Sequence, residues 1–287
     1  MRLQIGNFPN RLDLSARVVI GGGLGFGSVG LNADQIDGYL ARNAVDELKE
    51  LLQRNRMAVA TAQLGPNWNM DGELWEQALE KAEPRLQVLA ELGGKVTFSC
   101  PNRWPKAVGE AEWEWLVSKF QAYADWVGRY DVDLVFEFLG PQVGRPDPRR
   151  IMYPWVMGLD SALELIERAN RPNLGLILDV IHWWAGGGTY EDLHKVKGLP
   201  MTLHVFDLPE GVDPETMADS DRVLPGEGFI NLVRWLRILK EDGYDSDLMP
   251  EVLGPRAVDL AEADSWEGPR LVRDVYMQLL EQVEADS

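Results

Sequence analysis

Four metal-capable side chains each lie at the end of an apolar, strand-like run in the second half of the chain. The runs are VDLVFEF with Glu137, LGLILDV with Asp179, PMTLHVF with His204, and LMPEVL with Glu251. Three carboxylates and one imidazole form a hard, mixed donor set that suits Mn²⁺, Mg²⁺, Co²⁺ or Zn²⁺. The four residues are therefore predicted to bind one divalent metal ion.

Each of these residues alone has a simpler explanation. Burying a carboxylate within an apolar run costs on the order of several kcal/mol of desolvation free energy, unless the carboxylate is paired or bound to a metal. A salt bridge or the capping of the following helix would also meet that cost. All four together favour the metal site, because parallel barrel strands carry their C-terminal ends to the same rim.

The elements that would position these residues alternate along the chain. Eight apolar runs are separated by longer segments in which apolar residues recur every three or four positions. Several runs are apolar on both faces, which is typical of parallel strands covered by helices. The pattern predicts an α/β fold, a (β/α)8 TIM barrel that forms a single domain over residues 1–287. The predicted strands are 3–5, 27–31, 58–64, 95–99, 133–139, 174–180, 201–206 and 248–253, and the predicted helices are 34–53, 73–92, 110–129, 161–169, 230–240 and 269–283.

A glycine-rich segment, IGGGLGFG at 20–27, precedes the second predicted strand. Glycine loops that bind a dinucleotide follow a strand and open a helix, which is the opposite order. We therefore interpret this segment as a flexible connection and not as a nucleotide site.

The composition excludes several classes of function. The formal net charge of the 287 residues is −18, from 46 acidic and 28 basic side chains, and this field repels nucleic acid and anionic membrane surfaces. The single cysteine, Cys100, cannot form an intramolecular disulfide. The chain shows no signal-like N-terminal segment and no apolar stretch of the roughly 20 residues that a membrane span needs. We expect a cytoplasmic protein with a small-molecule substrate.

The order and spacing of five motifs resemble the xylose isomerase-like TIM barrels, the sugar isomerase and epimerase superfamily, and most of all its inosose isomerase branch. This resemblance implies that the four strand-end residues hold one divalent cation. It also implies that His182 and Arg222 face substrate oxygens, and that a homo-oligomer is possible. The motifs are VFEFLG with Glu137, LDVIHWWAGGG with Asp179 and His182, LHVFDLPEG with His204 and Asp207, DRVLPGEGFI with Arg222, and MPEVLGP with Glu251.

Such a site suits proton transfer between neighbouring carbons of a keto-sugar or keto-cyclitol. A cation chelated by the carbonyl and the adjacent hydroxyl acidifies the neighbouring C–H and stabilises a cis-enediolate. Glu137 and Glu251 could remove and return the proton. The predicted function is a divalent-metal-dependent sugar or keto-cyclitol isomerase or epimerase, with these two glutamates as the catalytic residues.

Further residues near the predicted rim are candidates for supporting roles. Trp183 follows the Asp179 strand, and Trp104 follows the fourth predicted strand. Their aromatic faces would suit the apolar face of a sugar or cyclitol ring, so both are predicted to bind substrate. Asp207 is expected to orient His204 or Arg222.

Two alternatives remain open. The same metal cradle could serve a lyase, such as an inosose or 3-dehydroshikimate dehydratase, or an enzyme that cleaves a 3-keto C-glycoside. The chain could also be a non-catalytic sugar-binding barrel, because fold alone does not establish activity. One departure from the family pattern weighs against a free-ketose epimerase: Val143 and Arg145 stand where those enzymes often carry a glutamate. Gly30 stands where the second strand often ends in a glutamate in this family, so no role is carried over for that residue.

Overall fold

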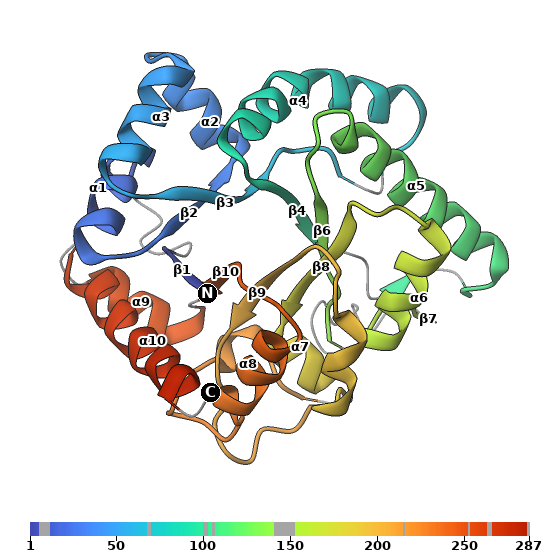
Figure 1. The fold of residues 1–287 in the computed structure, drawn as a ribbon. Coiled ribbons are helices and arrows are strands. Elements are labelled where there is room, and N and C mark those ends of the chain that lie inside the picture. The colour runs from blue at the N-terminus through green and yellow to red at the C-terminus, as the bar shows by residue number, and fades with distance from the viewer. Residues whose placement is uncertain are drawn as a thin grey trace.

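The strands form a closed barrel with helices around its outside (Figure 1). This computed structural model describes residues 1–5, 12–67, 70–99, 103–104, 107–140, 153–214, 216–251, 253–262 and 266–285. All neighbouring barrel strands are parallel, in the order β1-β10-β9-β8-β6-β4-β3-β2, which confirms the predicted (β/α)8 architecture. The barrel strands are β1 (Arg2–Ile5), β2 (Ser28–Asn32), β3 (Ala58–Gln63), β4 (Lys95–Ser99), β6 (Leu134–Glu137), β8 (Leu174–Asp179), β9 (Met201–Val205) and β10 (Asp247–Pro250).

The six predicted helices are present, one of them as two helices, and three further helices form that were not predicted. A single helix was expected over residues 34–53, but two form, because Asn32 caps one helix and the Glu47 side chain accepts from the backbone N–H of Ala44 to begin the next. The helices α1, α7 and α9 were not predicted. The helices are α1 (Leu14–Leu24), α2 (Ala33–Leu40), α3 (Val45–Arg54), α4 (Gly72–Leu92), α5 (Glu110–Gly128), α6 (Leu159–Ala169), α7 (Val180–Ala185), α8 (Leu232–Glu241), α9 (Gly254–Glu262) and α10 (Glu267–Ala285).

Two loops that leave the C-terminal ends of β4 and β6 pair with each other. The short strands β5 (Arg103–Trp104) and β7 (Tyr153–Pro154) form an antiparallel pair in which Trp104 lies opposite Tyr153. Both loops start at the rim where β4 and β6 end. Separately, none of the described helices has the length and apolarity that would be needed to cross a membrane.

The glycine-rich segment at 20–27 is helical through Leu24, so its interpretation as a flexible connection was wrong. Helix α1 begins at the N-cap Asp13, whose carboxylate accepts from the backbone N–H of Ala16, and it ends at Gly25 in the left-handed conformation (φ 89°). A Cβ at Gly22 would lie 2.4 Å from the carbonyl oxygen of Asn55, and a Cβ at Gly23 would lie 2.9 Å from the Trp266 ring. The glycines let α1 pack closely against its neighbours.

Substitution of Gly22 by Ala is expected to lower the free energy of unfolding by about 1–3 kcal/mol, because the new Cβ would overlap backbone that cannot move freely. Gly38→Ala is the matched control: this glycine lies in α2, and a Cβ added there would have nothing within 4 Å, so alanine should stabilise by up to about 1 kcal/mol. Urea denaturation measures both changes. A Gly22→Ala protein as stable as the control would contradict close packing at α1.

Candidate metal centre

The four predicted ligand residues meet at the C-terminal rim of the barrel. Glu137 ends β6, Asp179 ends β8, His204 lies in β9 and Glu251 directly follows β10. Asp179 and His204 are direct partners in the β8–β9 register. One ligand atom from each of the four side chains lies within 4.8 Å of every other. The four residues come from neighbouring strands, so they occupy one continuous arc of the rim.

His204 lies at the centre of this cluster. Its Nδ1 is 2.9 Å from Glu137 Oε1, 3.5 Å from Glu251 Oε2 and 3.9 Å from an Asp179 oxygen. Burial lowers the pKa of His204, but the carboxylates of Glu251 and Glu137 outweigh it and raise the pKa to about 10. The ring nitrogen thus faces a strongly negative environment that favours a cation.

Both carboxylate oxygens of Asp179 have partners that hold the side chain in place. Oδ1 accepts from the backbone N–H groups of Ile181 and His182, so Asp179 is the N-cap of α7, and Oδ2 lies 2.9 Å from Arg222. Burial raises the pKa of Asp179, yet the positive charge of Arg222 and the neighbouring histidines hold it below its usual range. This carboxylate therefore stays ionised, and it combines a capping role with its place in the cluster.

Arg222 is a buried counter-charge for the acidic residues. Its Nη1 is 2.9 Å from Asp179 Oδ2 and 2.7 Å from Glu251 Oε2, while its Nη2 is 2.8 Å from Asp219 Oδ1. Burial lowers the pKa of Arg222, and the three carboxylates raise it well above its usual value. Asp219 was not predicted as a site residue; it belongs to a 3-10 turn (Asp219–Asp221) immediately before Arg222. The spacing Asp219-x-x-Arg222 was its only signal.

The donor set fits a divalent cation. Three of the four residues are buried and the fourth, Glu251, is partly buried. Such ions bind ligand atoms at about 2.0–2.2 Å, so ligands on opposite sides of one ion lie about 4 Å apart, close to the spacing found here. Arg222 supplies one positive charge against three carboxylates of the cluster, and a divalent ion would offset the remainder. Glu137, Asp179, His204 and Glu251 are the residues that could hold it.

Asp207 has a different role from the one expected. Its carboxylate accepts from the backbone N–H groups of Leu208, Gly226, Gly228 and Ile230, and neither His204 nor Arg222 is among these partners. A Cβ at Gly228 would lie 2.3 Å from this carboxylate, so glycine is required there. Asp207 therefore shapes the 223–230 loop that follows Arg222.

A cavity of about 280 Å³ opens in front of the cluster. Glu137, His204 and Glu251 contribute to its lining, whereas Asp179 is not among the described lining residues. The lining from β1 to β4 is polar and carries one charged group, Arg17, from α1. The further polar residues of that part are Gln4, Asn32, Gln35, Thr61, Gln63 and Thr97. The cavity is therefore acidic on one side and mainly neutral on the other.

Three of the predicted substrate-binding residues, His182, Trp183 and Arg222, are not among the described residues that line this cavity. His182 is buried behind the cluster, where Nδ1 accepts from the backbone N–H of Gly140 and Nε2 is 3.5 Å from Arg222. Trp183 is 2% exposed and packs against Trp235 and Tyr190. The helical turn of α7 thus directs Trp183 into the core, and its contact with substrate stays a prediction.

The other residues expected near the substrate are Arg222 and Trp104. Arg222 is also buried and binds carboxylates where contact with substrate was expected. The backbone of Trp104 forms part of β5, and its side chain lies outside the described residues, as do Val143 and Arg145.

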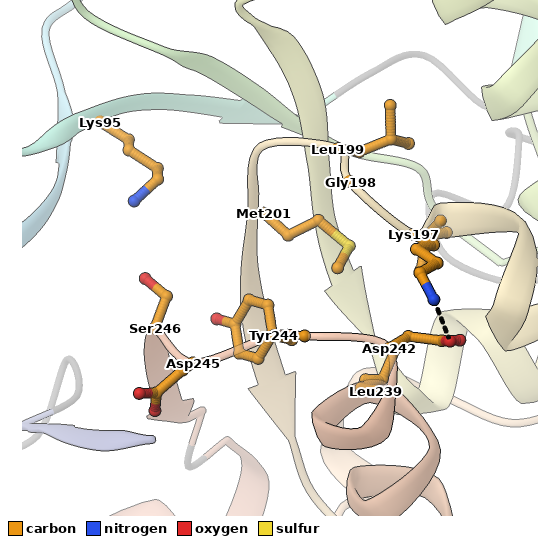
Figure 2. Close-up of a pocket in the computed structure, with 12 residues that line it drawn as sticks. Lys95, Lys197, Gly198, Leu199, Met201, Leu239, Asp242, Tyr244, Asp245 and Ser246 are labelled. Carbon is orange, nitrogen blue, oxygen red and sulfur yellow. Dashed lines mark hydrogen bonds and ion pairs between the residues drawn. The ribbon is translucent and has the colours of Figure 1, made fainter.

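A second hollow, of about 250 Å³, lies at the opposite end of the barrel. Figure 2 shows Lys95, Met201 and Ser246, from the beginnings of β4 and β9 and the residue before β10, around it. Its lysine and aspartate side chains are partly used in surface pairs such as Lys197–Asp242. In barrels of this architecture that end usually serves stability, so the candidate site is the rim with the four ligands.

Comparison with known proteins agrees with this geometry. Residues 23–274 match the family model of the xylose isomerase-like TIM barrel. Inosose isomerase from Halalkalibacterium halodurans is 26% identical over 81% of this chain and 79% of its own length. A 3-dehydroshikimate dehydratase from Pseudomonas aeruginosa is 27% identical over 61% of this chain, which is 26% of the dehydratase.

Solved structures share the fold as well. The IOLI protein, whose crystal structure contains a bound zinc atom, has a TM-score of 0.80 at 21% identity and covers 99% of this chain and 100% of its own. The barrel topology and the family match over most of the chain lead to one conclusion. This chain belongs to the xylose isomerase-like TIM barrel family.

Proposed function

We propose that this protein is a divalent-metal-dependent isomerase or epimerase of keto-cyclitols or sugars, and that it transfers a proton between adjacent carbons. The observation that carries the proposal is the position of Glu137 and Glu251. Both carboxylates belong to the four-residue cluster and both line the cavity in front of it. A substrate in this cavity would therefore meet two carboxylate bases beside one cation site.

The metal ion and the two glutamates, Glu137 and Glu251, would have different roles in the reaction. A bound divalent ion supplies electrophilic polarisation of the substrate carbonyl, which acidifies the neighbouring C–H. Glu137, from β6, and Glu251, after β10, approach the cavity from different strands, so one can remove the proton and the other can return it on the adjacent carbon. Burial raises the pKa of Glu251, but the charges of His204 and Arg222 outweigh it and keep the pKa below its usual value, so Glu251 is ionised and ready to accept a proton.

Arg222 and His182 act behind the reacting groups. Arg222 holds Asp179 and Glu251 through its Nη1 group, and His182 borders the same guanidinium. These contacts fix the carboxylates in position, which is the usual task of residues that surround metal ligands. We propose that they support the site and do not bind substrate directly.

The relatives support the substrate class. Inosose isomerases match across most of this chain, so a keto-cyclitol such as 2-keto-myo-inositol is the first substrate to test. The formal charge of −18 disfavours nucleic acid and anionic membrane surfaces as partners. We further propose a single-domain, cytoplasmic enzyme, with homo-oligomerisation as a property of the family to be measured.

A dehydratase is the second candidate. It is favoured by the match to 3-dehydroshikimate dehydratase and by Arg17, a buried cation on the cavity lining that could face a substrate carboxylate. The two reactions begin with the same proton removal and differ in the group that leaves. Product analysis separates them.

The test combines metal content with isotope exchange. Protein purified without chelator should hold about one divalent ion per chain, and Asp179→Asn should lower that content because it removes one ligand charge. The loaded protein should exchange solvent deuterium into 2-keto-myo-inositol without loss of water. Exchange that is accompanied by water loss, or water loss from 3-dehydroshikimate alone, would identify a dehydratase. Absence of a bound metal would contradict the proposal and leave the cluster as structural ion pairs.

A further inference from the structure

The side chain of Gln4 lies on the cavity lining with an unsatisfied acceptor. Gln4 is 1% exposed, and its Oε1 has no hydrogen-bond partner among the residues that the structure describes. A buried carbonyl without a partner is costly, so native proteins usually supply one from the chain, from water or from a ligand. The acceptor at Gln4 is therefore a candidate contact for a bound molecule.

The strand order places this acceptor across the barrel from Glu137 and on the strand next to that of Glu251. In the closed ring of eight strands, β1 with Gln4 is four positions from β6 with Glu137 in either direction. Both residues line the same cavity. A ring bound between Glu137 and Gln4 would present one edge to the four-residue cluster and another edge to Gln4.

Gly30 in β2 provides the space for the Gln4 amide. A Cβ at residue 30 would lie 2.5 Å from Gln4 Nε2 and 3.4 Å from Thr61 Oγ1. The closer atom is the end of a flexible side chain, so an added methyl group would move the amide and leave the backbone in place. Gly30 and Gln4 thus form one unit that fixes where the acceptor lies.

Arg17 adds a donor to the lining of the same cavity. Arg17 is 4% exposed and lines the same cavity. Its Nη1 and Nη2 donate to the carbonyl oxygens of Gly30 and Ile5, at 3.4 and 3.5 Å. Burial lowers the pKa of Arg17 to about 10, so it stays charged at neutral pH. Gln4 and Arg17 together can accept from and donate to one hydroxyl group.

We infer that Gln4, held by Gly30 and assisted by Arg17, is a positioning and specificity residue for a hydroxyl on the edge of the substrate ring that faces β1. The inference rests on the proposed function for the orientation of the ring. A hydroxyl can donate to Gln4 Oε1 while it accepts from Arg17, whereas a carboxylate has no proton to donate. The subsite therefore favours a hydroxyl over a carboxylate at the position that faces Gln4.

The test uses two variants that remove or displace the acceptor. Gln4→Met keeps the length of the side chain without its acceptor, and Gly30→Ala displaces the amide. Each should raise the KM for 2-keto-myo-inositol at least about tenfold, with kcat changed less than threefold or so, because the lost bond positions substrate in all states. Gln87→Met and Gly38→Ala, on exposed surfaces of α4 and α2, are the matched controls and should leave both constants unchanged.

A second measurement separates this inference from the proposed reaction. Calorimetric titration of the metal-loaded protein with 2-keto-myo-inositol reports binding even if no exchange occurs. Weaker binding by Gln4→Met than by wild type would support the subsite whether or not the reaction is an isomerisation. An unchanged KM and Kd in Gln4→Met would overturn the subsite and assign the acceptor to water. A wild type that binds 3-dehydroshikimate but not the polyol would also overturn the subsite.

Discussion

Replacing Glu251 by Gln is expected to slow solvent deuterium exchange into 2-keto-myo-inositol by at least about 10³-fold, because the amide cannot accept the proton. Glu251 lines the cavity, and its carboxylate lies 2.7 Å from Arg222 and 3.5 Å from His204. The substitution keeps the shape of the side chain but removes one of the two bases and one charge of the cluster. Substitutions at the supporting residues, which accept no proton from substrate, should slow exchange less.

The measurement must separate loss of a base from loss of metal. Exchange is followed by NMR in heavy water at saturating Mn²⁺, and bound metal is measured on the same samples. Glu241→Gln, at the exposed end of α8, is the control and should exchange at the wild-type rate. A Glu251→Gln protein that binds metal and retains more than about a tenth of the wild-type rate would show that another group carries the proton.

Substitution of Arg222 by Met is expected to produce the largest loss of stability, about 3–5 kcal/mol in the free energy of unfolding of the metal-free protein. The guanidinium is buried and pairs with Asp179, Glu251 and Asp219. Its removal leaves acidic groups together without their shared counter-charge. A divalent ion in the cluster would replace part of that charge, so the loss should be smaller when Mn²⁺ is present.

Denaturation in urea, with chelator and then with Mn²⁺, measures both effects. Arg234→Met is the matched control, because Arg234 pairs with Glu191 on the surface, where ion pairs contribute about 1 kcal/mol or less. If Arg222→Met and Arg234→Met were equally stable without metal, Arg222 would not be the counter-charge that we describe. An Arg222→Met loss that is the same with and without Mn²⁺ would argue against a cation in the cluster.

The barrel and the four-residue cluster could be predicted from the sequence because both depend on short-range patterns. Each barrel strand is an apolar run, and a strand-end side chain such as Glu137 or Asp179 interrupts that run where the rim must lie. Parallel strands then place the ends together without further information. The four ligand residues converge because their strands are neighbours in the barrel and all run in the same direction.

The rest depends on contacts between distant segments. The glycines of α1 look like a loop until Asn55 and Trp266 are known to pack against them. Trp183 was expected at the rim, but the short helix α7 directs it into the core. Gln4 carries no sequence signal, because one glutamine in a short apolar strand gives no indication of an unsatisfied acceptor.

The rim is divided by charge, and this division bears on how such a barrel can acquire new substrates. The acidic cluster comes from the contiguous strands β6, β8, β9 and β10, while β1, β3 and β4 offer neutral groups such as Gln4, Thr61 and Thr97. Mutational libraries confined to the neutral strands would vary ring recognition and spare the cation site. Retention of the metal could then serve as a screen for intact folding that does not depend on the substrate chosen. Substrate recognition and proton transfer could therefore be selected separately.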